Sequence, residues 1–177
     1  QTSNPVALAP AATPPWEELR EVLANHQVSA GFDALEGRYD SHYAGAHEAL
    51  RNYARASFLD GRPILESVMN LMGRIYRDFE YKPGVTDIST PLLEVLNRRQ
   101  GVCQDFAHLQ IACLRSMGLS ARYVSGYIHT IAPPGKAKVR GADASHAWLS
   151  VYCGDLGFID LDPTNNVIPG ERYITLG

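Results

Sequence analysis

The chain has 177 residues, of which 45% are hydrophobic and 20% charged, and these proportions are typical of one folded domain with a buried core. The formal net charge of −3 comes without a cluster of basic residues, which argues against nucleic acid as a partner. No apolar run approaches the ~18 residues that a membrane-spanning helix requires, so no membrane partner is expected.

The first residues of the chain have the composition of a linker. Four of the 11 prolines fall within the first 15 residues, and the stretch "NPVALAPAATPP" lacks the basic start and continuous apolar core of a secretion signal. We therefore expect residues 1–14 to be a linker remnant and residues 15–177 to form one domain. The chain is expected to be a fragment of a longer protein whose preceding domain is its partner.

The cysteine content points to a reducing environment. Three cysteines cannot all pair, and Cys103 and Cys113 are predicted to lie about 15 Å apart on one helix, too far for a disulfide. A cytoplasmic location is therefore expected.

The first half of the chain is predicted to be helical, because apolar residues recur there at intervals of three and four. Prolines and acidic residues stand at the predicted helix starts, and Asp60-Gly61 marks one predicted end. The expected helices cover residues 14–26, 43–59 and 63–79, and a short fourth helix runs from Pro91, capped by Thr90, to Arg98 and Arg99.

A central helix is predicted to begin at or next to Cys103 and to end before Gly118, which suits a helix C-terminus. Its apolar residues form two stripes, one of Phe106, Leu109, Cys113 and Met117 and the other of Ala107, Ile111 and Leu114. A helix that is apolar on two faces is expected to be buried.

After Gly118 the hydrophobic period changes from helical spacing to two, which predicts strands. The expected strands cover residues 121–130, 145–152 and 158–162, with a surface loop at residues 132–143 and a turn at residues 153–157. Helices followed by strands predict an α+β fold in which an antiparallel sheet packs on the central helix.

Cys103 is the candidate nucleophile. A thiol at a helix N-terminus is favoured as a thiolate by the helix dipole and by backbone N–H groups that lack an intrahelical partner. Arg98 and Arg99 add positive charge nearby in the sequence. The backbone N–H of Cys103 is also a candidate donor to an oxyanion.

Strand periodicity selects the groups that would assist this thiol. Matching the apolar faces of strands 145–152 and 158–162 leaves two registers. In one register His146 faces Asp162 directly, and in the other Asp162 is its diagonal neighbour, at roughly 7–8 Å between Cα atoms. Asp160 lies further from His146 in both registers, so Asp162 is the predicted orienting carboxylate.

These residues predict a Cys103–His146–Asp162 triad. His146 would form an ion pair with the thiolate and return a proton to the leaving amine, while Asp162 would hold the imidazole and stabilise its charged form. The expected reaction is attack on a peptide or protein amide, formation of a thioester, and release to water or a second amine.

The segments "GVCQDFAHLQIACLRSMGLSARYVSGY", "SHAWLSVY" and "GFIDLDPTNN" resemble the bacterial transglutaminase-like proteins, from about Phe79 to Tyr173. The resemblance implies a papain-like transglutaminase-core fold with the thiol at the start of the central helix. It also implies Cys103 as nucleophile, His146 as base, Asp162 as the third member and an N-terminal β-rich domain in the full protein. Relatives include cross-linking transglutaminases, cysteine proteases and amidases, so a hydrolase or an acyltransferase is expected.

Other features of the site are less defined by the sequence. No acidic loop has calcium-ligand spacing, and neither a cofactor nor a metal is expected. Tyr81 and Asn97 are candidate second oxyanion donors, because the tryptophan that fills this role in animal relatives has no counterpart here. Gln104 could contact substrate, and Trp148, on the same strand face as His146, either walls the cleft or packs in the core.

Two alternatives to a thiol enzyme stay open at the level of sequence. Cys103 could be a small buried apolar residue in a peptide-binding module whose catalytic site has degenerated. Cys103 and His146 could instead belong to a structural zinc site.

Overall fold

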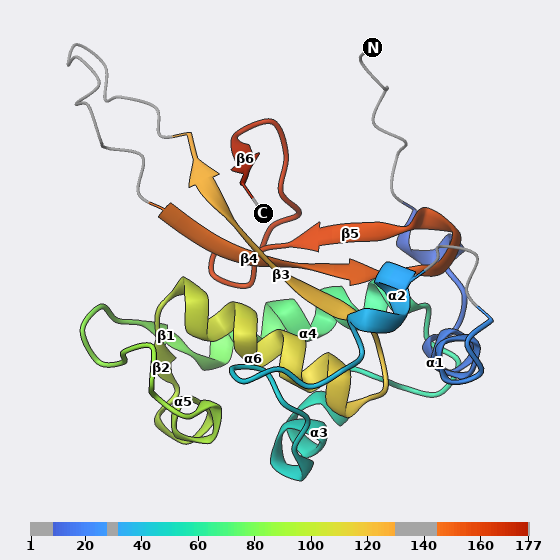
Figure 1. Ribbon diagram of the computed structural model, residues 1–177, viewed down its shortest axis with the longest axis horizontal. Helices are drawn as coiled ribbons and strands as arrows, with labels where there is room; N and C mark the ends of the chain where they lie inside the picture. The colour runs from blue at the N-terminus through green and yellow to red at the C-terminus, as the bar shows by residue number, and fades with distance from the viewer. Residues whose placement is uncertain (1–8, 28–31, 130–144, 177) are drawn as a thin grey trace.

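The computed structural model describes residues 9–27, 32–129 and 145–176, and its secondary structure is an α+β arrangement. Helices occupy the first part of the chain, and an antiparallel sheet follows, as the sequence predicts. Figure 1 shows helix α6 (Cys103–Ser116) below this sheet, with α3 (Glu48–Arg55) and α5 (Leu92–Arg98) on its other side. No helix in the described ranges is long and apolar enough to cross a membrane.

The helices expected over residues 14–26 and 63–79 and the short helix from Pro91 lie close to their predicted positions, while the helix expected over residues 43–59 is shorter. The early helices are α1 (Trp16–Ala24), α2 (Phe32–Glu36), α3 (Glu48–Arg55), α4 (Ile64–Asp78) and α5 (Leu92–Arg98), with a short 3-10 turn η1 (Pro10–Ala12) before them. Trp16, Leu19 and Leu23 of α1 are buried, which confirms the helical stripe read from the sequence. Helix α2 was not predicted. Tyr76 of α4 lies at the helical spacing of the apolar residues, which predicts burial, but it is 51% exposed.

Two predicted helix starts are wrong. The helix expected over residues 43–59 begins only at Glu48, because the ring Nδ1 of His47 accepts a hydrogen bond from the backbone N–H of Ala49 and caps the helix. Thr90 does not cap α5: its hydroxyl accepts a hydrogen bond from the backbone N–H of Asp87, and Pro91 occupies the capping position.

Helix α6 is the centre of the hydrophobic core, as predicted. Phe106, Leu109, Ile111 and Leu114 are each at most 3% exposed, and α6 packs on helices α3, α4 and α5 and on the sheet. Gly118 follows the helix with a φ of +81°, the left-handed conformation that glycine adopts without strain. The helix therefore ends where the sequence places its end.

The sheet has the strand order β5-β4-β3-β6, formed by β3 (Ala121–Ile128), β4 (Ser145–Tyr152), β5 (Phe158–Leu161) and β6 (Tyr173–Thr175). All three pairings are antiparallel. The turn between β4 and β5 contains a short 3-10 helix, η2 (Gly154–Leu156). The loop predicted at residues 132–143 lies outside the described residues.

The register of β4 on β5 is the second of the two that the sequence allows. Leu149 faces Leu161, and Val151 faces Ile159, so the apolar residues of both strands share one face. Asp162 directly follows β5 and lies diagonally across from His146, because its pairing position would be opposite Trp148.

A second, two-stranded sheet holds the segment that precedes α6. Strand β1 (Glu80–Tyr81) runs parallel to β2 (Gln100–Gly101), which ends just before the helix. Backbone N–H groups of Glu80 and Lys82 donate to the carbonyl groups of Arg99 and Gly101, at 2.8 Å each. This two-stranded pairing, which the sequence pattern did not predict, anchors the segment that delivers Cys103.

Strand β4 is buried on both faces from Ala147 to Tyr152, and the glycine at position 126 contributes to this burial. Gly126 of β3 pairs with His146, and a Cβ atom added there would lie 2.6 Å from Cη2 of Trp148 and would overlap the backbone carbonyl of Ile174 in β6. The absence of a side chain at Gly126 therefore lets the indole ring of Trp148 and the backbone of β6 both lie against β3 at this position.

We predict that Gly126→Ala displaces β6 or the Trp148 ring and lowers the free energy of unfolding by about 1–3 kcal/mol, the usual cost of overpacking. Urea denaturation at neutral pH measures this change. Gly170→Ala is the matched control, because a Cβ at position 170 meets nothing within 4 Å. Equal stabilities of the two variants would show that the close approach at Gly126 is not needed.

Candidate active site

Cys103 is the first residue of α6, and the residues before the helix hold it in place. The carboxylate Oδ2 of Asp105 accepts hydrogen bonds from the backbone N–H of Val102 at 2.8 Å and from the Thr86 hydroxyl at 2.7 Å. Gly101 leaves room for this carboxylate, because a Cβ there would lie 2.8 Å from the same oxygen. Asp105 thus fixes the helix start and the thiol on it.

Cys103, His146 and Asp162 form one continuous hydrogen-bonded chain. Nε2 of His146 lies 2.7 Å from Oδ2 of Asp162, and the imidazole is also hydrogen-bonded to the Cys103 thiol. Because Nε2 is engaged by the carboxylate, Nδ1 is the ring nitrogen left for the sulfur. Backbone N–H groups of Gln104 and Ala147 also hydrogen-bond to the Cys103 sulfur.

The carboxylate of Asp162 is completely buried and accepts five hydrogen bonds. Oδ2 receives three, from His146, from the Asn165 side-chain amide and from the Tyr173 hydroxyl, each at 2.7 Å. Oδ1 receives two, from the backbone N–H groups of Thr164 at 2.9 Å and Asn165 at 3.3 Å. These donors compensate the cost of burying a charge.

Sequence analysis missed Asn165 and Tyr173. Asn165 lies three residues after Asp162, in the segment "DPTNN". This closeness in the sequence could have indicated a local hydrogen bond to the Asp162 carboxylate. Tyr173 belongs to β6, a strand of three residues whose pattern is too short to predict its pairing.

Trp148 is fully buried, which is the packing role considered for it, and it also contacts the His146 ring. Its ring stacks on His146, with centroids 6.1 Å apart, and meets the edge of Tyr173 at 5.3 Å. Its indole N–H donates to Oδ2 of Asp160 at 3.1 Å. Asp160 therefore binds Trp148, while Asp162 binds His146.

The electrostatics of the site favour an ion pair. Burial lowers the pKa of His146, but the hydrogen bonds to Asp162 and Cys103 outweigh it and raise the pKa to about 9. Burial raises the pKa of Cys103, but the hydrogen bonds to His146 and to the backbone N–H groups outweigh it, so the thiol pKa is below its ordinary value. Both shifts favour the ion pair of thiolate and imidazolium over the neutral pair.

The other two thiols have the opposite electrostatics. Cys113 and Cys153 are fully buried, and burial raises the pKa of each to about 12. Cys103 is partly exposed at the helix N-terminus. The three cysteines therefore differ strongly in thiolate character.

Of the other predicted site residues, Gln104 contacts Cys103, whereas Tyr81 and Asn97 lie on neighbouring elements. The Gln104 backbone contacts the Cys103 sulfur, and its side chain lines a pocket next to the thiol. Tyr81 pairs with Gly101 in the small sheet and is 53% exposed, while Asn97 is exposed on α5. Among the described residues, neither forms a side-chain hydrogen bond with Cys103, His146 or Asp162, so their assignment as oxyanion donors stays a prediction.

Metal binding was the third interpretation of Cys103 and His146. Within residues 9–27, 32–129 and 145–176, no group of three or more His, Cys, Asp or Glu side chains is arranged to hold a metal ion.

The chain belongs to the transglutaminase-like superfamily, whose core-domain model matches residues 51–163. The uncharacterized protein Rv2569c of Mycobacterium tuberculosis is 46% identical over 170 residues, which is 94% of this chain and 52% of that protein. The chain therefore spans about half the length of the mycobacterial relatives that it matches.

Solved structures share this fold. A crystal structure from Cytophaga hutchinsonii, described as a "Putative Cysteine Protease", is 27% identical, with a TM-score of 0.67 over 81% of this chain and 45% of that chain. The periplasmic domain of TgpA from Pseudomonas aeruginosa is 19% identical, with a TM-score of 0.55 over 77% of this chain and 49% of that chain. The predicted papain-like transglutaminase-core fold is confirmed.

We predict that Asp162→Asn lowers the pKa of the His146 ring from about 9, because the charge that raises it is removed while the burial that lowers it stays. Titration of the ring resonances by NMR measures the shift. Asp160→Asn is the matched control, since Asp160 bonds Trp148 and not His146. A His146 pKa that is unchanged in Asp162→Asn would contradict the assigned carboxylate.

We predict that Tyr173→Phe lowers the free energy of unfolding by about 1–3 kcal/mol at pH 7, because one donor to a buried carboxylate is lost. The Asp162 pKa is lowered despite burial, through hydrogen bonds from His146, Tyr173 and Asn165. Such a carboxylate stabilises the fold above the pKa of an unfolded aspartate, about 3.9, and loses this effect as the pH falls.

The difference between wild type and Tyr173→Phe should therefore shrink as the pH falls below about 4. Urea denaturation across this range measures it. Tyr39→Phe is the control, because Tyr39 is 63% exposed. A deficit in Tyr173→Phe that persists unchanged at low pH would mean that the hydroxyl acts through packing alone.

Proposed function

We propose that this chain is a cysteine-dependent amide hydrolase or acyltransferase that acts on peptide-type amides through Cys103, His146 and Asp162. The observation that carries the proposal is the continuous chain of hydrogen bonds from the Cys103 thiol through the imidazole to the buried carboxylate. A catalytic thiol requires a lowered pKa, a base and a group that orients the base, and these three residues supply them.

The first half of the reaction forms a thioester. The Cys103 thiolate attacks the amide carbonyl carbon, and the electron pair of the C=O bond moves to the oxygen. When this pair returns, the C–N bond breaks, and the His146 imidazolium gives its proton to the departing amine. Asp162 holds the ring in place throughout and stays ionised.

The backbone supplies a donor for the oxyanion of this step. Cys103 occupies the first position of α6, where a backbone N–H has no acceptor within the helix. The positive end of the α6 dipole lies at the same point and favours both the thiolate and the oxyanion.

The second half of the reaction releases the acyl group. Neutral His146 takes a proton from water, the oxygen attacks the thioester carbonyl, and the C–S bond breaks to regenerate the thiolate beside the imidazolium. A primary amine in place of water gives a new amide by the same steps. The triad serves both acceptors, so hydrolysis and acyl transfer are two outcomes of one mechanism.

Selective alkylation tests the proposal directly. Near pH 6 an ordinary thiol of pKa ~8.5 is almost entirely protonated, so we expect iodoacetamide to alkylate Cys103 at least tenfold faster than unfolded protein of the same sequence. Cys113 and Cys153 should stay unmodified, since burial raises the pKa of each to about 12. Mass spectrometry of digested protein measures each site.

Turnover provides the second measurement. Acyl-donor peptides are supplied with and without a primary amine, and released amine, free acid and transamidated product are quantified. Cys103→Ala should abolish all turnover while retaining the unfolding free energy of the wild type within about 1 kcal/mol. Uniform slow alkylation of the native protein would contradict the proposal, as would turnover that survives in Cys103→Ala.

A further inference from the structure

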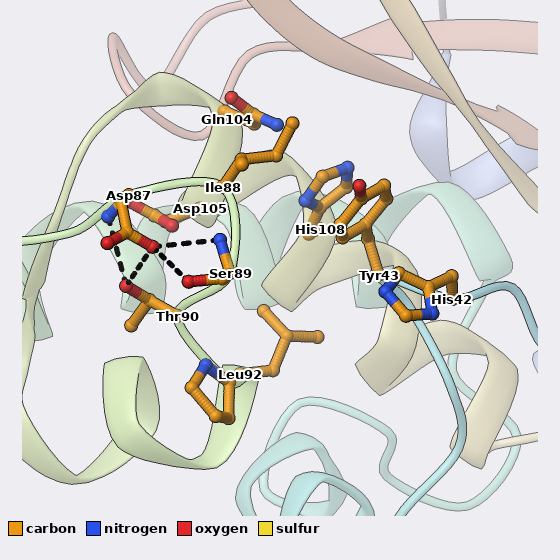
Figure 2. A pocket seen from close by; sticks show the side chains of 11 residues that line it. His42, Tyr43, Asp87, Ile88, Ser89, Thr90, Leu92, Gln104, Asp105 and His108 are labelled. Atoms are coloured by element: carbon orange, nitrogen blue, oxygen red, sulfur yellow. Dashed lines mark hydrogen bonds between the residues drawn. The ribbon is translucent and has the colours of Figure 1, made fainter.

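A pocket of about 280 Å³ lies beside the first two turns of α6, next to the candidate nucleophile. Gln104, Asp105 and His108 of α6 line it, together with residues 87–92 and the loop residues His42 and Tyr43. Figure 2 shows the carboxyl groups of Asp87 and Asp105 on one side and the rings of Tyr43 and His108 on the other. Neither Cys103 nor His146 lines this pocket, and Gln104, the residue after Cys103, is the lining residue nearest to the thiol in the sequence.

The acidic side of the pocket offers carboxylate oxygens that are not used within the described chain. The hydrogen bonds to Asp87 all reach Oδ1, from the Ser89 backbone N–H at 2.8 Å, the Ser89 hydroxyl at 2.6 Å and the Thr90 hydroxyl at 3.4 Å. Both hydrogen bonds to Asp105 reach Oδ2, although this side chain is only 8% exposed. Oδ2 of Asp87 and Oδ1 of Asp105 therefore have no hydrogen-bond partner among the described residues.

The carboxylates of Asp87 and Asp105 differ in their exposure to solvent. Asp87 is an exposed group whose loop is preorganised by its own hydrogen bonds, and these bonds lower its pKa. Asp105 is more than nine-tenths buried yet lines the pocket. Since none of the 11 lining residues is Lys or Arg, the pocket has no positive charge of its own to neutralise the pair.

The other side of the pocket is a cluster of aromatic rings, in which His42 meets Tyr43 nearly perpendicularly, with centroids 4.7 Å apart. Tyr43 stacks on His108 with centroids 5.5 Å apart and an interplanar angle of 9°, and Tyr123 of β3 lies 4.9 Å from the His108 ring. Tyr43 is 42% exposed, so its ring is available to a ligand. Burial lowers the pKa of His108 and outweighs the effect of Asp105, so this ring is neutral at neutral pH and does not repel a cation.

We propose that this pocket binds the cationic side chain of an arginine or lysine in the acyl-donor peptide. The enzyme thereby selects peptides in which such a residue lies close to the amide that Cys103 attacks. Carboxylate oxygens on one side and aromatic faces on the other are the groups that recognise a guanidinium or ammonium ion. Ile88 and Leu92 also line the pocket and provide apolar contact for the aliphatic part of the side chain.

Because the pocket is not lined by the triad, the bound cation acts in recognition and is not the amine that attacks the thioester. This specificity rests on the proposed function, since it presumes that a peptide is presented to Cys103. An anionic side chain would instead meet two carboxylates without a compensating charge.

Matched electrophilic probes test the proposal. Two peptidyl acyloxymethyl ketones are compared that differ only in arginine or its neutral isostere citrulline, and the second-order rate of Cys103 alkylation is measured for each by mass spectrometry. We expect the arginine probe to react at least fivefold faster with the wild type. The preference should fall towards one in 1 M salt, because the attraction at the exposed Asp87 is screened.

The variant Asp87→Asn isolates the charge. Asparagine keeps an oxygen that can accept the hydrogen bonds from Ser89 and Thr90, so the loop conformation is retained. We expect the arginine-to-citrulline rate ratio to fall below two in this variant. Asp155→Asn is the matched control. Asp155 is an exposed carboxylate in η2, after the end of β4 that is far from His146, so this variant should keep the rate ratio of the wild type.

Equal rates for the two probes with the wild type would overturn the pocket assignment, as would an undiminished ratio in Asp87→Asn. Alkylation of the wild type by iodoacetamide is measured in parallel and reports on the thiol alone, so a reactive thiol without arginine preference overturns only the specificity. If the thiol is unreactive, NMR titration of Cys103→Ala with acetyl-arginine amide and acetyl-citrulline amide decides the point. Equal shifts of the His108 ring resonances by the two compounds would then overturn the binding site independently.

Discussion

The buried carboxylate of Asp162 is the constraint on which the rest of the site depends. An ionised group without solvent access is costly unless hydrogen bonds surround it, and five donors converge on this one. Those donors come from the turn after β5, from β6 and from β4. Satisfying one charge therefore ties three segments together, and the imidazole of His146 is held as part of the same requirement.

This arrangement explains why the small strand β6 belongs to the site. β6 pairs with β3 and delivers the Tyr173 hydroxyl to Asp162, while the Tyr173 ring packs on Trp148. Trp148 in turn stacks on His146, so the ring that must stay positioned is held by one hydrogen bond to a carboxylate and by aromatic packing. Gly126 admits both the indole and β6 to the same place, which makes a glycine in mid-strand part of the site's construction.

The sequence predicted those parts of the site that follow from periodicity. A helix with a period of 3.6 places Cys103 at its start, and strand alternation leaves only two registers, both of which bring Asp162 within reach of His146. The turn geometry then decides between them, with Leu149 facing Leu161. Contacts made by short or irregular segments left no such pattern: the Tyr173 hydroxyl, the His47 cap and the parallel pairing of β1 with β2 each depend on the folded chain.

Membership of the superfamily defines the fold more closely than it defines the reaction, and the structure indicates the physical reason. In the proposed reaction, Cys103, His146 and Asp162 act only on the carbonyl carbon and on the proton of the leaving group, which every peptide-type amide provides. Under the same proposal, selection between substrates requires a place where side chains are distinguished, and the pocket between Asp87 and Tyr43 offers a charged wall and an aromatic wall. Asp105 connects the two functions, since one of its oxygens fixes the helix start that carries Cys103 while the other is left for the pocket. Chemistry and recognition would then share a single buried carboxylate on the first turn of α6.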